Sequence, residues 1–261
     1  MSAISDPEHG PRGFGEANPD FGRGALRRRV RLVAEPGAVR AGVEDAYHSF
    51  RMTLRHDGTR ITALEPRFLR VPLSTCPGAE APLQRLVGLA LDTPWAKLAT
   101  SEDPRANCTH LFDLASLAMA HALRGGERDY EVRVPDEHPG PVWTTLHRDG
   151  IELLRWQTFK ARILAPGPFA GKPLLRGFSR WANAELAGDD LEAALVLHKA
   201  YFVSRARPWN VEDGAGKPVA HHVMMRGACH SYSEPQMSVA IRNHGNVIDT
   251  SDPAVPLVAD L

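Results

Sequence analysis

One stretch of the chain limits the possible folds more than any other, the apolar run at residues 109–124. Aliphatic and aromatic residues recur there at helical spacing, and Gly125-Gly126 follows, which is a common way for a helix to end. The polar residues of the run form one narrow wedge: Asp113, Ser116 and Arg124. A helix that is apolar around most of its circumference must be covered by protein on nearly every side. We therefore expect a fold that is built around this helix.

A β-hairpin is predicted shortly before that helix. Residues 46–55 alternate between apolar and polar side chains, which is typical of a half-buried strand. His48 falls on the apolar face, together with Phe50 and Met52, and so it points towards the core. Asp57-Gly58 then predicts a tight turn, and residues 60–64 a returning strand.

The same order of elements recurs in the second half of the chain. Residues 142–147 predict a strand, Asp149-Gly150 a turn and residues 151–163 a long returning strand. Each hairpin precedes a Pro-rich loop, a shorter helix and a long apolar helix. These elements predict an α+β fold in which antiparallel hairpins pack on long buried helices. Residues 46–124 and 141–207 are candidates for an internal duplication. The alternative is a coincidence, because Asp-Gly hairpins are common.

The remaining elements are short, and one long domain is expected to contain all of them. They are a strand at 26–33, helices at 82–91, 94–99, 178–186 and 190–207, a strand at 219–225 and a short helix from 235. Residues 1–24 are rich in Gly, Pro and Asp with few aliphatics, which predicts a flexible arm. The domain then spans residues 25–261, and its end (243–261) looks like an extended wrap or a loose end.

Composition excludes several classes of protein. The 31 Lys and Arg residues balance the 31 Asp and Glu residues, so no net charge draws the chain to nucleic acid or to an anionic membrane. No apolar run reaches the length of a membrane span, and the first residues lack the apolar core of a secretion signal. Three scattered cysteines do not make a disulfide framework. We expect a cytoplasmic protein with free thiols that acts on a small molecule; whether it forms a homodimer stays open.

Three short motifs resemble a known family. CPGAEAPLQRLVGL at 76–89 and NCTHLFDLASLAMAHAL at 107–123 are similar to the bacterial domain-of-unknown-function family 2889, whose members carry a Cys-Pro loop, a Gln-Arg-Leu-Val-Gly helix and a Cys-Thr-His-Leu helix start. GACHSYS at 227–233 is similar to that family's C-terminal Cys and Tyr. The resemblance covers residues 46–124 well and the rest loosely. It implies a shared motif and no particular reaction.

Motifs for common cofactors are absent from the sequence. It has no dinucleotide fingerprint, no P-loop, no nucleophile elbow and no HExxH zinc motif. We therefore expect no cofactor. Seven soft ligands are available to a zinc ion: Cys76, Cys108, Cys229, His110, His221, His222 and His230. They lack the spacing of known zinc sites, so no metal is expected.

Histidines and one cysteine are the best candidates for catalysis. Cys108 and His110 lie at the start of the apolar helix, where the helix dipole favours a thiolate. An imidazole at this place is a candidate general base. The alternative is that Cys108 is a small core residue and that His110 bonds to a loop. His121 lies on nearly the same side of this helix as His110.

Three further side chains complete the candidate site. His198 lies on the apolar face of the helix at 190–207, where a histidine can also be an ordinary core residue. His48 points inward from the first hairpin, and Tyr232 could assist. The sequence thus favours a cofactor-independent enzyme, of lyase or hydrolase type, that acts on a small apolar or aromatic molecule by histidine acid–base chemistry. A non-catalytic metal- or ligand-binding protein is the alternative.

Overall fold

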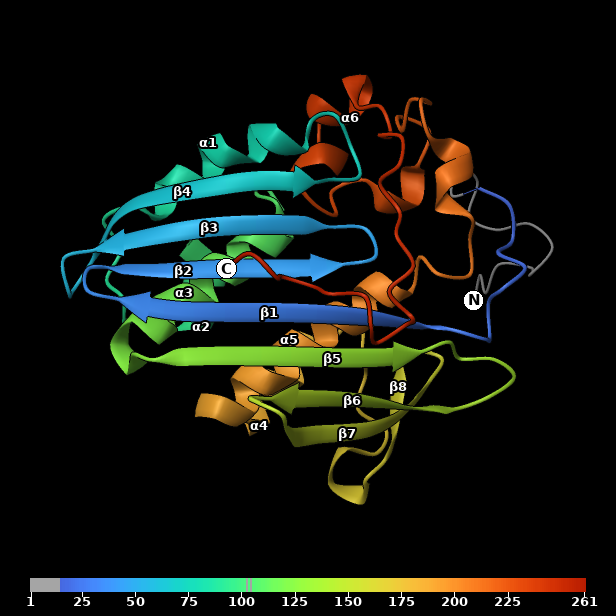
Figure 1. Cartoon of the computed structure of the whole chain (residues 1–261), viewed down its shortest axis with the longest axis horizontal. Coiled ribbons are helices and arrows are strands. Elements are labelled where there is room, and N and C mark those ends of the chain that lie inside the picture. Colours follow the sequence, from blue (N-terminus) through green and yellow to red (C-terminus); the bar gives the residue numbers. More distant parts are fainter. Residues whose placement is uncertain (1–14, 102, 104) are drawn as a thin grey trace.

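The computed structural model describes residues 15–101, 103 and 105–261, and the main feature of these residues is a single antiparallel sheet. Its strands lie in the order β4-β3-β2-β1-β5-β6-β7-β8 (Figure 1). Their bounds are β1 Ala25–Glu35, β2 Ala38–Asp45, β3 Ser49–His56, β4 Ile61–Arg70, β5 Glu127–Pro135, β6 Val142–Arg148, β7 Ile151–Phe159 and β8 Arg162–Ala165. Two four-stranded meanders therefore run outward from the central β1–β5 pair.

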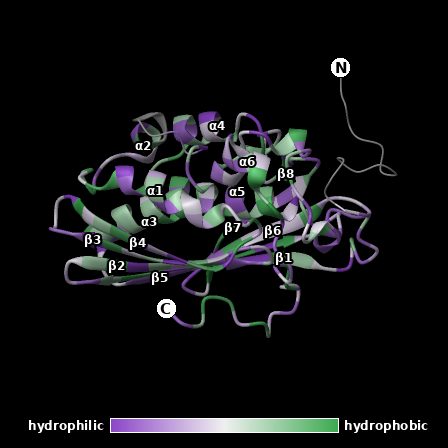
Figure 2. Ribbon diagram, turned by 90° about the horizontal axis from the view of Figure 1, so that it is seen from above, coloured by the Kyte–Doolittle hydropathy of each residue, from purple (hydrophilic) through white to green (hydrophobic). Residues whose placement is uncertain are grey.

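The helices cover one face of this sheet, and the C-terminal stretch crosses the other (Figure 2). Their bounds are α1 Glu80–Leu83, α2 Trp95–Ser101, α3 Thr109–Arg124, α4 Phe178–Glu185, α5 Gly188–Ser204 and α6 Gln236–Val239. The long helix α3 packs on β1, β2 and β3, and α5 packs on β5, β1, β6 and β7. The observed architecture confirms the predicted α+β class. No helix of the described residues is both long and apolar enough to cross a membrane.

Side-chain alternation explains why the core lies between the sheet and the helices. On β1 the even-numbered residues from Leu26 to Leu32 are buried, whereas Arg27, Arg29 and Arg31 point to the other face. The apolar run of α3 closes over the buried side chains, as its sequence predicts. Helix α3 ends where it was expected to end, because Gly125 adopts a positive φ of 77°.

The predicted internal duplication stays a prediction. Each meander is followed by a long helix on the same face of the sheet, which agrees with a repeat. The two Asp-Gly turns, however, join different strands: Asp57-Gly58 lies between β3 and β4, and Asp149-Gly150 between β6 and β7. If β1–β4 is matched strand by strand with β5–β8, the β3–β4 turn corresponds to the β7–β8 turn. The two Asp-Gly turns are then not equivalent.

Three predicted elements need correction. The helix expected at 82–91 is not formed: Pro82 and Leu83 end the short α1, a 3₁₀ turn follows at Gln84–Leu86, and Gly88 with a φ of 89° turns the chain back. The strand expected at 151–163 is divided into β7 and β8 by Lys160 and Ala161, which both have positive φ. The strand expected at 219–225 is a set of turns with a 3₁₀ helix at Val223–Met225.

The segment at residues 15–24 is also more ordered than expected. The Asn18 amide donates to the Pro208 carbonyl, and the amides of Gly22 and Gly24 donate to Asp136. These bonds correct the expected flexible arm for this part of it, while residues 1–14 lie outside the described residues. At the other end, residues 243–261 cross the sheet as the predicted extended wrap: Arg27 and Arg29 donate to the carbonyls of Asp252 and Leu257.

Candidate functional site

An ionised carboxylate lies under the helix layer, where the β2–β3 turn meets the start of α3. Asp45 is the last residue of β2, and its side chain is fully buried. The strand register places Arg28 of β1 directly opposite, and its guanidinium pairs with Asp45 Oδ2. Asp45 Oδ1 accepts hydrogen bonds from the amides of Tyr47 (2.9 Å) and His48 (3.0 Å). The carboxylate therefore shapes the turn as well as balancing a buried cation.

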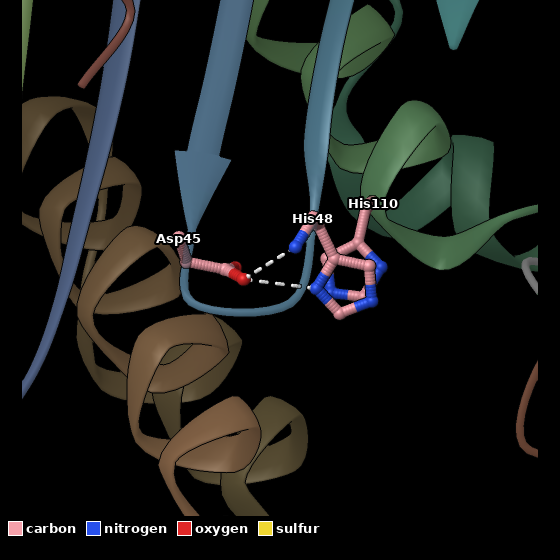
Figure 3. Close-up of side chains that lie close together, drawn as sticks. All are labelled: Asp45, His48 and His110. Carbon is pink, nitrogen blue, oxygen red and sulfur yellow. Dashed lines mark hydrogen bonds and ion pairs between the residues drawn. The ribbon is translucent and has the colours of Figure 1, made fainter. Parts of the chain in front are cut away.

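His48 is oriented by this carboxylate. Its Nδ1 lies 3.0 Å from Asp45 Oδ1, within the same turn (Figure 3). Burial raises the pKa of Asp45, but the charges of His48 and Arg28 and the hydrogen bonds lower it by more. The pKa of Asp45 is therefore below its usual range. An ionised Asp45 can only accept a hydrogen bond. His48 therefore carries a proton on Nδ1, and in its neutral form it presents a lone pair on Nε2.

His110 stacks against His48 from the first turn of α3. Their ring centroids are 3.9 Å apart with an angle of 31° between the planes (Figure 3). Burial lowers the pKa of His110 well below 6.5, and the nearby positive charges of His48, Arg28 and Lys199 lower it further. His110 Nε2 is buried and has no hydrogen-bond partner among the described residues. The pair thus combines a neutral imidazole that has a free nitrogen with one that Asp45 holds in place.

A cavity of about 690 Å³ lies beside His110, between α2, α3, α5 and the sheet. Buried Val30 and Val43 of the sheet line its floor, and the exposed Asp92 and Leu123 lie at its mouth. The remaining lining mixes aliphatic side chains with polar and charged ones, and it includes the ring of Trp95. This size is ordinary for a site that encloses a small organic molecule.

Two polar residues of α5 reach the same cavity. His198 stacks on the ring of Phe178, with centroids 3.9 Å apart and planes 6° from parallel. Burial, with a smaller effect of Lys199, lowers the pKa of His198 to about 3, so its ring is neutral. Lys199 Nζ forms an ion pair with Asp113 of α3 at 2.8 Å. This pair ties α5 to α3 one helical turn beyond His110.

The structure brings together His48 and His110 and places His198 on the same cavity, but it leaves the other predicted residues elsewhere. Tyr232 belongs to a second hydrophobic cluster, and its hydroxyl lies 3.4 Å from Arg242 Nη2. His121 Nε2 lies 3.0 Å from the Gly126 carbonyl at the far end of α3.

Cys108 is also different from what its position suggests. It is the N-cap residue of α3, but it is buried, and burial raises the pKa of its thiol to about 12. The loss of hydration therefore outweighs the favourable effect of the helix dipole. The expected thiolate at the start of the helix is not formed at neutral pH, and Cys108 behaves as a small core residue.

Three side chains of the site could hold a metal ion. One ligand atom each from Asp45, His48 and His110 lies within 4.8 Å of the others. The donor set is of the kind that zinc accepts. Asp45, however, already accepts three hydrogen bonds on Oδ1, and Arg28 pairs with its Oδ2. A cation at this place would have to displace those donors and lie close to a buried guanidinium.

A protein-family model matches part of the chain. Residues 30–124 match the model of a family described as "Protein of unknown function (DUF2889)". The resemblance to family 2889 is confirmed. The matched segment of DUF2889 contains Asp45, His48 and His110 and ends at the last residue of α3. His198 and Lys199 lie outside it, so the cavity is lined partly by the matched segment and partly by the second half of the chain. No curated protein matched the chain.

Sequence reasoning missed Arg28, Asp45 and Lys199. Arg28 belongs to a short basic run that looks like a solvated strand edge, and only the β1–β2 register shows its pairing with Asp45. The alternation of Val39, Ala41 and Val43 would have predicted β2 and placed Asp45 on the inner face. Nothing comparable in the sequence indicates that Lys199 of α5 pairs with Asp113 of α3.

Proposed function

We propose that this protein is an enzyme without a cofactor, which moves a proton on a small, largely apolar or aromatic molecule. The observation that supports the proposal best is the half-buried His48–His110 pair, in which His110 borders the cavity and its buried Nε2 has no partner among the described residues. Buried polar atoms in folded proteins nearly always have a partner, and a bound molecule that reaches His110 Nε2 would supply one.

In this proposal His110 acts as the general base. Its neutral state at physiological pH leaves Nε2 free to take a proton from a bound substrate. The imidazolium that forms would lie against the His48 ring, which Asp45 holds in place through the Nδ1 hydrogen bond. His198 is the proposed second acid–base group, because it lines the same cavity. Elimination, retro-aldol cleavage and hydrolysis need no groups beyond these, which agrees with a lyase or a hydrolase.

The test compares turnover by the wild-type protein and by His110→Gln. A panel of uncharged aromatic alcohols and ketones is incubated with the protein, and substrate loss is followed by liquid chromatography and mass spectrometry. Gln keeps a similar size and one polar nitrogen, so the fold should remain intact while turnover falls about a hundredfold or more. His147→Gln, at an exposed residue of β6, is the control and should keep full activity. Equal turnover by wild type and His110→Gln would contradict the proposal.

A metal-binding role is the second candidate, because Asp45, His48 and His110 have ligand atoms close together. Under this alternative the dialysed protein would retain about one equivalent of zinc, and Zn²⁺ would raise the melting temperature of wild type but not of His48→Ala. Elemental analysis and a thermal melt with and without added Zn²⁺ measure both effects. A metal-free protein whose melting temperature does not respond to Zn²⁺ leaves the acid–base proposal as the explanation of the cluster.

A further inference from the structure

The charged side chains around the cavity are already balanced by one another. Arg28 pairs with Asp45 at the floor, and Lys199 pairs with Asp113 on the wall between the two long helices. Towards the mouth, Arg124 pairs with Glu192. A charged ligand would have to break one of these pairs or remain uncompensated in an apolar space. Asp92, the remaining charged lining residue, is exposed at the mouth.

The rest of the lining consists of uncharged side chains. Many of them are aliphatic: Val30, Val43, Leu91, Leu114, Leu117, Ala120, Leu191, Leu195 and Val196. Hydroxyl groups and the His198 ring lie between them, and the Ser116 hydroxyl already donates to the Phe112 carbonyl. His110 also lines the cavity, and its Nε2 is buried without a hydrogen-bond partner among the described residues. Such a wall binds an apolar body, and a few polar groups then set the orientation of the ligand.

We infer that the cavity takes an uncharged molecule with an apolar, ring-sized body and one hydroxyl group, which lies against His110, and that it excludes carboxylates. The inference rests on the proposed function for its site and goes beyond it by stating the charge and the polar group of the substrate. A hydroxyl group can donate the hydrogen bond that His110 Nε2 lacks. A carboxylate would have to compete with Asp113 for Lys199, or with Asp45 for Arg28, to balance its charge.

Equilibrium binding tests this inference without any need for turnover. Three probes of nearly equal size are titrated into the full-length protein at neutral pH by isothermal calorimetry: 2-naphthol, naphthalene and 2-naphthoate. We expect 2-naphthol to bind about tenfold more tightly than naphthalene, because it alone can bond to His110. The ionised 2-naphthoate should bind at least about a hundredfold more weakly than 2-naphthol. Equal or tighter binding of 2-naphthoate would overturn the inference, and so would the absence of binding by all three probes.

Two variants locate the binding and one serves as a control. His110→Phe keeps a flat ring but removes the polar nitrogen, so the preference for 2-naphthol over naphthalene should disappear while naphthalene still binds. His147→Phe makes the same change on β6 outside the cavity lining and should keep that preference. Leu117→Trp fills the cavity and should remove binding of every probe. A preference that survives in His110→Phe would contradict the assigned polar contact.

The outcome separates this inference from the proposed function. If 2-naphthol binds selectively through His110 but His110→Gln has the turnover of wild type, the ligand class is right and the general base is wrong. If turnover depends on His110 but 2-naphthoate is the preferred probe, the base is right and the ligand class is wrong.

Discussion

Asp45 holds several parts of the site together. Its carboxylate is fully buried, pairs with an arginine on the neighbouring strand, and accepts hydrogen bonds from two amides of a turn and from a histidine ring. A buried charge is stable only when such partners surround it. The residue therefore has two functions: it closes the β2–β3 turn, and it fixes the ring on which His110 stacks.

Replacing this carboxylate should destabilise the protein strongly. In Asp45→Asn the guanidinium of Arg28 stays buried without its counter-charge, and we expect the free energy of unfolding to fall by about 3 kcal/mol. Urea denaturation followed by circular dichroism measures the change. Glu65→Gln is the matched control, because its pair with Arg55 is exposed and so contributes little to stability. Similar losses in the two variants would show that Asp45 is not structurally important.

The neutral histidines of the cavity predict how stability depends on pH. The pKa of His198 is about 3 in the folded protein and 6.5 when unfolded, so between these values the unfolded chain binds more protons. The free energy of unfolding therefore rises with pH through this window and stops rising above about pH 6.5. The slope due to His198 is up to about 1.4 kcal/mol per pH unit.

Chemical denaturation at a series of pH values measures this slope. His198→Phe cannot take up a proton, so its slope between pH 4 and pH 6 should be smaller than that of wild type by about 1 kcal/mol per pH unit. If His198→Phe has the slope of wild type, His198 is not held in its neutral form.

At the scale of elements, α3 is the part of the fold that the sequence predicts best. Its apolar run, its start after Cys108 and its end at the two glycines are local signals, and the structure confirms all three. The two hairpins were found for the same reason. By contrast, β5 was missed, although Tyr130, Val132 and Val134 alternate with charged residues there. The turn between β7 and β8 has no Gly or Asn, and so nothing in the sequence marked it.

The site was predicted only in part, for the same physical reason. The alternation at 46–55 and the pattern of α3 were enough to place His48 and His110 on the inner side, although β3 begins only after His48. The pairing of Arg28 with Asp45 depends on strand register, and the place of Lys199 depends on the packing of α5 beside α3. Contacts between elements distant in sequence are set by tertiary structure, which local patterns do not describe.

The end of α3 allows a prediction about a single element. Gly126 has a φ of 74°, and a Cβ atom at this position would meet no other atom within 4 Å. Gly126→Ala should therefore cost only the strain of the left-handed backbone, about 1 kcal/mol in the free energy of unfolding. Gly140→Ala has equal space without a positive φ, and its stability should stay within about 0.5 kcal/mol of wild type. Thermal or urea denaturation compares the two; equal stabilities would contradict the role assigned to this glycine.

At the scale of the whole molecule, the sheet separates two different surfaces. One face carries the helices and the cavity, and the C-terminal stretch crosses the other (Figure 2). That stretch is fastened by arginines of the sheet: Arg51 pairs with Asp260, and Arg31 donates to the Leu261 carbonyl. Val258 is fully buried against Gly42 of β2. The absence of a side chain at Gly42 is what allows this close approach.

A side chain at Gly42 should release the C-terminal stretch without disturbing the cavity. A Cβ atom there would lie 2.6 Å from Val258 Cγ1, which is closer than atoms can approach. In Gly42→Val we expect faster hydrogen exchange in residues 252–261, while the exchange of α3 and α5 stays as in wild type. Mass spectrometry of peptic fragments measures both. Unchanged exchange at residues 252–261 would show that this contact does not hold the C-terminal stretch.

The central claim is that His110 is a neutral base beside a histidine fixed by Asp45, and nuclear magnetic resonance of the imidazole nitrogens tests it most directly. Protein with ¹⁵N-labelled histidine is titrated from pH 8 to pH 5, and the rings are assigned with His110→Gln and His48→Gln. The account predicts that His110 stays neutral through the whole range, since burial and nearby positive charge lower its pKa. It also predicts that His48 keeps its proton on Nδ1. A His110 ring that titrates near pH 6.5, like a histidine in water, would contradict the account.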